Sequence, residues 1–254
     1  MNFHSIEKHS LCIEKNEFYE LYLNEKFSFM YDYNAMYLLF QPVLEEFLLI
    51  ENIQFEFHKD IDFNYMKFYW PANTPFTPEI MNYFNENNYG IEMLELYTVF
   101  PEKFKITKKN SAVRIEWVTD FSLPDYKKIN FQQDLHEGVD FAEKKQAVYD
   151  INFHDSSIYQ IIAYLDNIPV GGTDIIEKDK TIEIDNLFVC KEYRKQGIGS
   201  EIQQFIMKHA KDKQILLLAD GEETARNMYR KQNYQYEGYR LAAQKEFNKN
   251  LGVE

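Results

Sequence analysis

Residues 182–200 read Ile182-Glu183-Ile184-Asp185-Asn186-Leu187-Phe188-Val189-Cys190-Lys191-Glu192-Tyr193-Arg194-Lys195-Gln196-Gly197-Ile198-Gly199-Ser200. A strand-like apolar run ends near Val189, and a turn with two glycines then leads into an amphipathic stretch. The first backbone N–H groups of a helix have no partner within the helix, and the helix dipole favours negative charge there. Glycine lets such a backbone approach an anion without a Cβ atom in the way. The stretch therefore predicts a strand–turn–helix unit that holds a phosphate group.

The spacing of this turn separates it from other phosphate-binding motifs. Arg194 and Lys195 lie just before Gly197 and Gly199 and add positive charge, which gives the pattern Arg-x-x-Gly-x-Gly. A dinucleotide-binding turn needs Gly-x-Gly-x-x-Gly, and a P-loop needs Gly-Lys followed by Ser or Thr. Neither pattern is present. A buried strand over residues 215–220 and a helix over 222–232 are expected to follow.

Residues 189–200 resemble the motif of the GCN5-related N-acetyltransferase (GNAT) superfamily, in which Arg/Gln-x-x-Gly-x-Gly/Ala binds the pyrophosphate of acyl-coenzyme A. Residues 224–234 are similar to the family's Ala-x-x-Leu-Tyr-x-Lys-x-Gly-Phe ending. The resemblance covers residues 111–254 and is strongest over 181–234. It implies an α/β (α+β) fold with a mixed, mostly antiparallel central sheet flanked by helices.

The resemblance also assigns cofactor-binding roles to particular positions. The backbone N–H groups that would hold the pyrophosphate of acetyl-CoA belong to Gln196, Gly197, Ile198, Gly199 and Ser200, with Arg194 and Lys195 beside them. The main-chain groups that would pair with the pantetheine arm, at a splayed strand of the family, belong to Leu187, Phe188 and Val189. The cosubstrate implied is acetyl-CoA, without a metal.

Three residues are candidates for the chemical steps. Tyr229 occupies the position of a general acid that protonates the departing thiolate, although an aromatic ring that only packs on the sheet fits as well. Asp185 and Glu183 alternate onto one face of their strand, where either could accept a proton from the substrate ammonium. Both could instead be solvated or cation-binding carboxylates. Cys190 is disfavoured as a nucleophile, because no His lies near it in sequence and the family transfers the acyl group directly.

Some positions depart from the family pattern. Glu222 stands where the family often has an Asn that contacts pantetheine, which puts that contact in doubt. Asn233 replaces the usual Gly before the closing aromatic residue, and Asn tolerates the left-handed conformation that such a turn requires. The basic residues Lys208, Lys211 and Lys213 read as a solvated helix end, with binding of the 3′-phosphate of CoA as the alternative.

The spacing of apolar residues predicts two domains, one over residues 1–110 and one over 111–254. In the second domain we expect strands at 112–118, 157–166, 170–177 and 181–190, helices within 124–153, and a closing strand pair over 235–247. In the first domain we expect helices over the first 50 residues, a strand at 63–70, a helix from Thr77-Pro78 and a strand at 90–100. Residues 103–110, with four Lys, read as a solvated linker.

A weak internal similarity connects the two halves. Residues 83–89, which read Tyr-Phe-Asn-Glu-Asn-Asn-Tyr, align with residues 228–234, which read Met-Tyr-Arg-Lys-Gln-Asn-Tyr. Strand-like residues follow both segments. The first half therefore reads either as an accessory domain that is a degenerate GNAT-like copy of the second, or as a chance similarity in a chain rich in Asn and Tyr.

The composition limits the partners. The net charge of -13 disfavours nucleic acid and anionic membranes and suits a cationic amine, although solubility alone explains it too. Two distant cysteines and no visible signal segment lead us to expect a cytoplasmic protein. We expect an N-acetyltransferase that moves acetyl from acetyl-CoA to a primary amine of a small molecule or peptide. A non-catalytic acyl-CoA sensor or protein-interaction module is the alternative, and the oligomeric state stays open.

Overall fold

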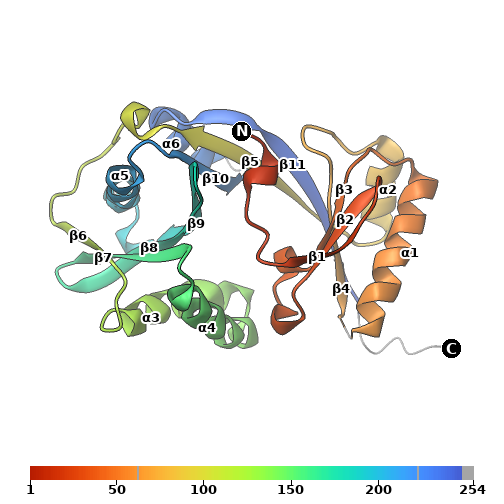
Figure 1. Ribbon diagram of the computed structural model, residues 1–254, viewed down its shortest axis with the longest axis horizontal. Helices are drawn as coiled ribbons and strands as arrows, with labels where there is room; N and C mark the ends of the chain where they lie inside the picture. Colours follow the sequence, from red (N-terminus) through yellow and green to blue (C-terminus); the bar gives the residue numbers. More distant parts are fainter. Residues whose placement is uncertain (62, 222, 248–254) are drawn as a thin grey trace. The chain divides into compact units, whose positions relative to one another are not determined.

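The computed structural model describes residues 1–61, 63–221 and 223–247 (Figure 1). The chain forms two compact units. Unit 1 comprises Met1 and Leu96–Glu237, and unit 2 comprises Asn2–Glu95 and Gly238–Glu254. This division differs from a single boundary at residue 110, because strands β5 (Gly90–Val99) and β11 (Gln235–Glu246) are each shared between the two units.

Unit 1 is built on a mixed sheet with the strand order β5-β10-β9-β8-β7-β6. Its further elements are β6 (Val113–Trp117), α3 (Leu123–Asp134), α4 (Val139–His154), β7 (Ile158–Leu165), β8 (Ile168–Glu177), β9 (Thr181–Val189), α5 (Ile198–Ala210), β10 (Gln214–Asp220) and α6 (Glu223–Lys231). Neighbouring strands from β6 to β9 are antiparallel, and β9 and β10 are parallel. Helices α3 and α4 cover one face of this sheet and α5 covers the other (Figure 1). The predicted fold class is confirmed.

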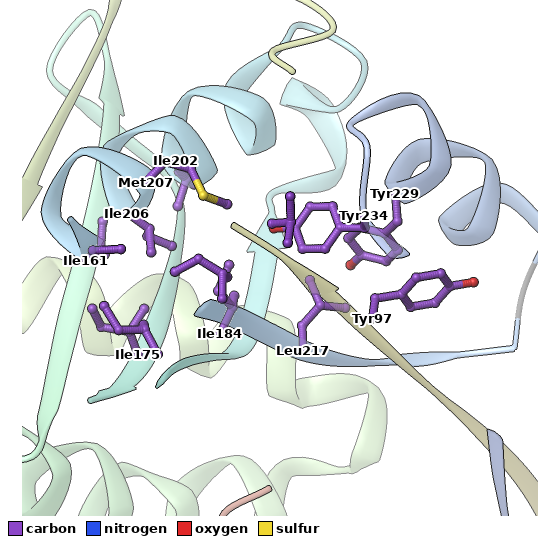
Figure 2. Packing of buried hydrophobic residues seen from close by; sticks show 14 of the residues in the cluster. Tyr97, Ile161, Ile175, Ile184, Ile202, Ile206, Met207, Leu217, Tyr229 and Tyr234 are labelled. Atoms are coloured by element: carbon purple, nitrogen blue, oxygen red, sulfur yellow. The ribbon is translucent and has the colours of Figure 1, made fainter. Parts of the chain in front are cut away.

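The core of unit 1 lies between α5 and the sheet. Ile202 and Ile206, one helical turn apart on α5, are fully buried against Ile161, Ile175 and Ile184 of the strands β7, β8 and β9 (Figure 2). The four-residue spacing puts these α5 side chains on a single face of the helix. This packing fixes where α5 begins relative to the end of β9.

Unit 2 has a sheet of its own with the order β1-β2-β3-β4-β11. Its further elements are β1 (Leu11–Lys15), β2 (Tyr19–Leu23), β3 (Ala35–Leu38), α1 (Leu44–Asp60), β4 (Tyr65–Tyr69) and α2 (Pro78–Glu86). The strands are antiparallel except for the parallel pair β3 and β4. Both α1 and α2 lie on one face of the sheet (Figure 1), where Phe47 and Phe84 pack on Phe68 and Trp70.

The two halves of the chain repeat one order of elements. The series β1-β2-β3-α1-β4-α2-β5 matches β7-β8-β9-α5-β10-α6-β11, and the corresponding pairs β3–β4 and β9–β10 are both parallel. The aligned helix ends also agree: Asn88 and Asn233 are both left-handed, with φ of 59° and 66°. After each of them, the N–H of Tyr89 or Tyr234 donates to the carbonyl five residues earlier, at 3.0 Å in both cases. These features favour an internal repeat over a chance similarity.

The apolar spacing predicts helices over the first 50 residues, and this prediction is wrong. They form the three strands β1, β2 and β3, short 3₁₀ turns and only the start of α1. The side chains of β2 are buried on both faces of the sheet, so this strand lacks the alternation that marks a half-exposed one. A second correction concerns residues 235–246, which form one long strand rather than a strand pair.

Candidate active site

The turn before α5 presents a row of unbonded backbone N–H groups. Within the described part of the chain, none of the N–H groups of residues 196–200 donates a hydrogen bond to another group. Gly197, directly before the helix, is left-handed with φ of 90°. A Cβ atom at Gly197 would lie 2.8 Å from the carbonyl oxygen of Lys108. Both observations require glycine here, and the unbonded N–H groups leave the helix start open to an anion.

The segment expected to be a solvated linker packs against this turn instead. Lys108 Nζ donates to the carbonyl of Lys195 at 2.6 Å, and Asn110 Nδ2 donates to the carbonyl of Gln196 at 3.0 Å. The backbone N–H of Asn110 donates to Glu201 Oε1 at 2.8 Å, which engages the acidic side chain in the first turn of α5. Residues 108–110 therefore hold the carbonyl groups of the turn, which fixes its conformation.

Strands β9 and β10 separate as they approach the turn. Their pairing runs only from Thr181 to Ile184 on β9, although β9 continues to Val189. On the opposite edge, Phe188 and Val189 pair with β8. The main chain of residues 185–189 consequently has one edge without a strand partner, at the place where Leu187, Phe188 and Val189 were expected to meet pantetheine. That pairing stays a prediction, and the edge it requires is present.

Tyr229 lies on α6 in the core of unit 1. Its ring contacts the rings of Tyr97 and Tyr234, with centroids 5.2 and 5.3 Å away (Figure 2). Tyr234 donates its hydroxyl to Gln203 Oε1 at 2.8 Å, whereas the Tyr229 hydroxyl has no hydrogen-bond partner among the described residues. Burial, with the charge of Asp220, raises the pKa of Tyr229 to about 12. The phenol therefore stays protonated at neutral pH and remains available as a donor.

Asp185 and Glu183 lie on the same face of the sheet, as their spacing predicted. This is the face of α3 and α4, because the alternating residues Ile182 and Ile184 point to the other face, into the α5 core. Glu183 is buried, and Asp185 is partly exposed with no hydrogen bond to its carboxylate from the described residues. An accessible, unbonded carboxylate can accept a proton more readily, which favours Asp185 over Glu183.

A polar network beside Asp185 was not anticipated from the sequence. Asp174, the cross-strand partner of Asp185 on β8, is fully buried and accepts hydrogen bonds from Tyr126 Oη and, at 2.8 Å, from Asn152 Nδ2. Burial, with the charge of Asp185, raises the pKa of Asp174 to about 6. Asn186, left-handed with φ of 52°, donates from Nδ2 to Asn130 Oδ1 at 3.0 Å. The only sequence signal was an acidic residue in the middle of an otherwise apolar strand.

The remaining candidates have structural roles or lie outside the described chain. Arg194 Nε donates to the carbonyl of Val189 at 2.9 Å, which ties the turn to the end of β9, and Lys195 is exposed. Lys213 Nζ donates to Glu177 Oε1 at 2.7 Å, so it anchors a strand rather than a phosphate. Burial raises the pKa of Cys190, which makes a thiolate nucleophile less accessible. Glu222 lies outside the described residues.

The corresponding helix start in unit 2 is closed. Helix α1 is the counterpart of α5, and no glycine precedes it. The carboxylate of Glu46 accepts a hydrogen bond from the N–H of Val43 at 2.9 Å. An acidic side chain thus occupies the position that an anion would need. Of these two corresponding helix starts, the one before α5 is the one with unbonded N–H groups.

The described ranges hold neither a metal-binding cluster nor a membrane-spanning helix. No group of three or more His, Cys, Asp or Glu side chains is placed there to hold a metal ion. None of the described helices is both long enough and apolar enough to span a bilayer.

Comparison with known families divides the chain much as its architecture does. Residues 121–234 match the Acetyltransferase (GNAT) family, and residues 1–97 match a domain of unknown function, DUF5613. No curated protein matches the chain.

Solved structures extend the likeness to nearly the whole chain. A functionally unknown conserved protein from Staphylococcus epidermidis is 30% identical, with 98% of each chain covered and a TM-score of 0.91. A GCN5-related N-acetyltransferase from Sphaerobacter thermophilus is 10% identical over 92% of this chain and 82% of its own, with a TM-score of 0.62. A tandem GNAT protein from the clavulanic acid biosynthesis pathway is 9% identical over 90% and 78%, with a TM-score of 0.55.

The fold is therefore that of two-domain GNAT-like proteins. Residues 121–234 are the part of the chain that matches the GNAT acetyltransferase family.

Proposed function

We propose that the chain is an N-acetyltransferase that moves an acetyl group from acetyl-CoA to a primary amine of a small molecule or peptide. The observation that carries the proposal is the open start of α5 beside the unpaired edge of β9. Five adjacent N–H groups suit a pyrophosphate, and the free strand edge suits the amide groups of a pantetheine arm.

The chemistry assigned to the site is direct transfer. The amine nitrogen attacks the thioester carbonyl carbon, the C–S bond breaks with the thiolate as leaving group, and the nitrogen loses its second proton to solvent to give the amide. Asp185 accepts the proton that the substrate ammonium must lose, directly or through water. Tyr229 donates its proton to the departing thiolate and is restored by solvent. Holding both reactants in one place supplies much of the acceleration.

Two features support these roles. The unbonded carboxylate of Asp185 lies on the face of the sheet that α3 and α4 cover, next to the polar network of Asp174. The Tyr229 hydroxyl has no hydrogen-bond partner among the described residues, and its pKa of about 12 means that it carries its proton at neutral pH. The net charge of -13 favours a cationic acceptor over an anionic one.

The test is release of free CoA thiol from acetyl-CoA in the presence of amine panels. The panels comprise polyamines, aminoglycosides, amino acids and peptides with a free N-terminus. We expect at least one class to release thiol above the rate of hydrolysis and to yield an acetylated product by mass spectrometry. Tight binding of acetyl-CoA with no turnover on any amine would contradict the enzyme assignment and favour a non-catalytic acyl-CoA sensor.

A further inference from the structure

A groove lies on the outer side of α3 and α4, the helix pair that covers one face of the sheet in unit 1. Its volume is about 530 Å³, and its walls come from α3, the loop before it and the second half of α4. The residues that line it include Asp120, Leu123, Lys127, Lys128, Phe131 and Asp150. The network around Asp174 uses other side chains of the two helices, which are buried against the sheet. None of the groove residues belongs to the groups assigned to acetyl transfer.

A fully exposed aromatic ring stands at the edge of this groove. Phe121, in the loop directly before α3, has 96% of its surface exposed, more than any other large apolar side chain that the structure describes. Its neighbours in sequence Asp120 and Leu123 line the groove, and Leu123 and Phe131 give the groove an apolar wall. A lone exposed apolar side chain needs no explanation, but a protruding ring beside an apolar groove offers two complementary shapes on one surface.

A second copy of the chain is the partner that fits both shapes at once. In an interface with two-fold symmetry the same patch is used twice, so residue i of one copy contacts residue j of the other and j contacts i. A ring that protrudes next to a groove meets this requirement, because each copy offers one Phe121 and accepts another. Leu123, Lys127 and Phe131 are spaced four residues apart, so they form one stripe along α3. An antiparallel α3 of a second copy can lie along that stripe.

The charges at the groove suit a second copy, although the chain as a whole has a net charge of -13. Lys127 Nζ of α3 contacts Asp150 Oδ2 of α4 at 2.6 Å, so these two charges are already matched. Asp120 and Lys128 are exposed, and neither forms an ion pair with another described residue. The four charges cancel, so the groove does not add to the repulsion between two acidic chains.

The two unmatched charges are also placed for reciprocal pairing. Asp120 and Lys128 lie four residues before and four residues after Pro124. A two-fold axis near Pro124 sets the two copies of α3 antiparallel, and it brings Asp120 of each copy beside Lys128 of the other. The same axis carries Phe121 of each copy toward the groove of the other.

We propose that this groove is the interface of a symmetric homodimer, in which the ring of Phe121 of each copy enters the groove of the other and Asp120 pairs with Lys128 across the two-fold axis. The apolar contacts lie at the centre of the interface and the ion pairs at its rim, as in other specific interfaces. No residue of the turn before α5 takes part. The proposal therefore does not depend on the proposed acetyl transfer.

The test is sedimentation velocity of the full chain over a concentration series from about 1 to about 100 μM, which covers the affinities of ordinary dimers. We expect the dimer to form as the concentration rises. Phe121→Ser is expected to raise the dimer Kd at least about tenfold, because a buried aromatic side chain at the centre of an interface carries much of its affinity. Circular dichroism should show this variant to be folded, since the ring is exposed in its own copy.

Charge reversal tests the reciprocal pairing. Asp120→Lys and Lys128→Asp each bring like charges together across the axis, and each alone is expected to raise the dimer Kd. The double variant exchanges the two charges and keeps the net charge at -13. It should return the dimer Kd to within about threefold of the wild type, because the pair is restored in the opposite sense.

The matched control is Leu11→Ser. Leu11 is also strongly exposed, at 77%, but it belongs to unit 2 and lies outside the groove, so its replacement should leave the dimer Kd unchanged. A chain that stays monomeric throughout the series would overturn the proposal. So would unchanged dimerisation of Phe121→Ser, or a loss in Leu11→Ser as large as that in Phe121→Ser. A double variant that dimerises no better than the single reversals would overturn the pairing of Asp120 with Lys128.

Discussion

At position 229 the chain carries a tyrosine where the internal repeat has Phe84 in unit 2. The two rings occupy aligned positions on α6 and α2, and both are buried. Packing alone therefore needs an aromatic ring but not a hydroxyl. The hydroxyl is retained in the unit whose helix start is open to an anion, and this difference supports a chemical role for Tyr229.

Replacement of Tyr229 by Phe isolates that role. We expect kcat to fall at least about a hundredfold, the lower end for loss of a general acid, while the affinity for acetyl-CoA stays within about twofold. The thermal unfolding temperature should stay that of the wild type, since the hydroxyl bonds to no described residue. Steady-state kinetics measures kcat and calorimetric titration measures the affinity for acetyl-CoA. An unchanged kcat would remove Tyr229 from the mechanism.

Asp174 gives a prediction about pH. Its pKa in the folded chain is about 6, against 3.8 for the free side chain, because burial disfavours its ionised form. The folded state thus binds this proton more tightly. The resulting stabilisation is fully present below pH 3.8 and is lost as the pH rises through about 6, by up to roughly 3 kcal/mol.

Comparison with Asp174→Asn isolates the titration of Asp174 together with its coupling to Asp185, because groups distant from Asp174 titrate alike in the two proteins. The wild type should lose free energy of unfolding relative to the variant between pH 4.5 and 7.5. Urea unfolding at both values measures the change. A difference between the two proteins that does not vary with pH would show that Asp174 ionises as freely as in water.

At the scale of elements, the turn before α5 depends on residues 108–110, which lie far from it in sequence. Replacing Asn110 by Ala removes the bond from Nδ2 to the carbonyl of Gln196 but keeps the backbone bond to Glu201. We expect the Kd for acetyl-CoA to rise about fivefold, the worth of one hydrogen bond that orders the turn.

The matched control for Asn110→Ala is Lys109→Ala. Lys109 is the preceding residue and is exposed. Titration of both variants with acetyl-CoA separates ordering of the turn from the general effect of a change in this segment. Equal affinities of the two variants would contradict the role of Asn110.

Some of these elements could be predicted from the sequence and others could not. The segment from β9 to α6 was predicted closely, because two glycines, a buried strand and a periodic helix are local signals. The three strands of the first 50 residues were missed, because β2 is buried on both faces and shows no alternation. Asp174 and Asn110 were missed because their roles arise from partners distant in sequence, which spacing along the chain does not reveal.

At the scale of the molecule, each unit relies on a strand from the other half of the chain. Residues 242–246 of β11 pair with β4 in unit 2, and Ala243 belongs to the core there. Tyr97 and Val99 of β5 belong to the core of unit 1. A cut near residue 110 therefore separates the first half from a strand that its own sheet needs.

A fragment of residues 1–110 should consequently lack cooperative unfolding. Without β11, the edge of β4 is unpaired and apolar core residues lie open, which favours aggregation. Joining residues 238–247 to the end of residues 1–95 by a flexible linker should restore a cooperative transition, followed by circular dichroism during urea unfolding. A well-folded 1–110 fragment would show that β11 is dispensable to unit 2.

The proposed activity requires the turn before α5 to hold the pyrophosphate of acetyl-CoA. The most direct measurement is calorimetric titration of acetyl-CoA into the wild type, Gly199→Ala and Gly199→Glu. A Cβ atom at residue 199 meets only Val189 Cγ2, at 3.7 Å, so both variants should fold. We predict binding to the wild type and to Gly199→Ala, and a loss of about a hundredfold or more in Gly199→Glu, where a carboxylate faces the phosphates. Equal binding to all three proteins, or no binding to the wild type, would contradict this role of the turn.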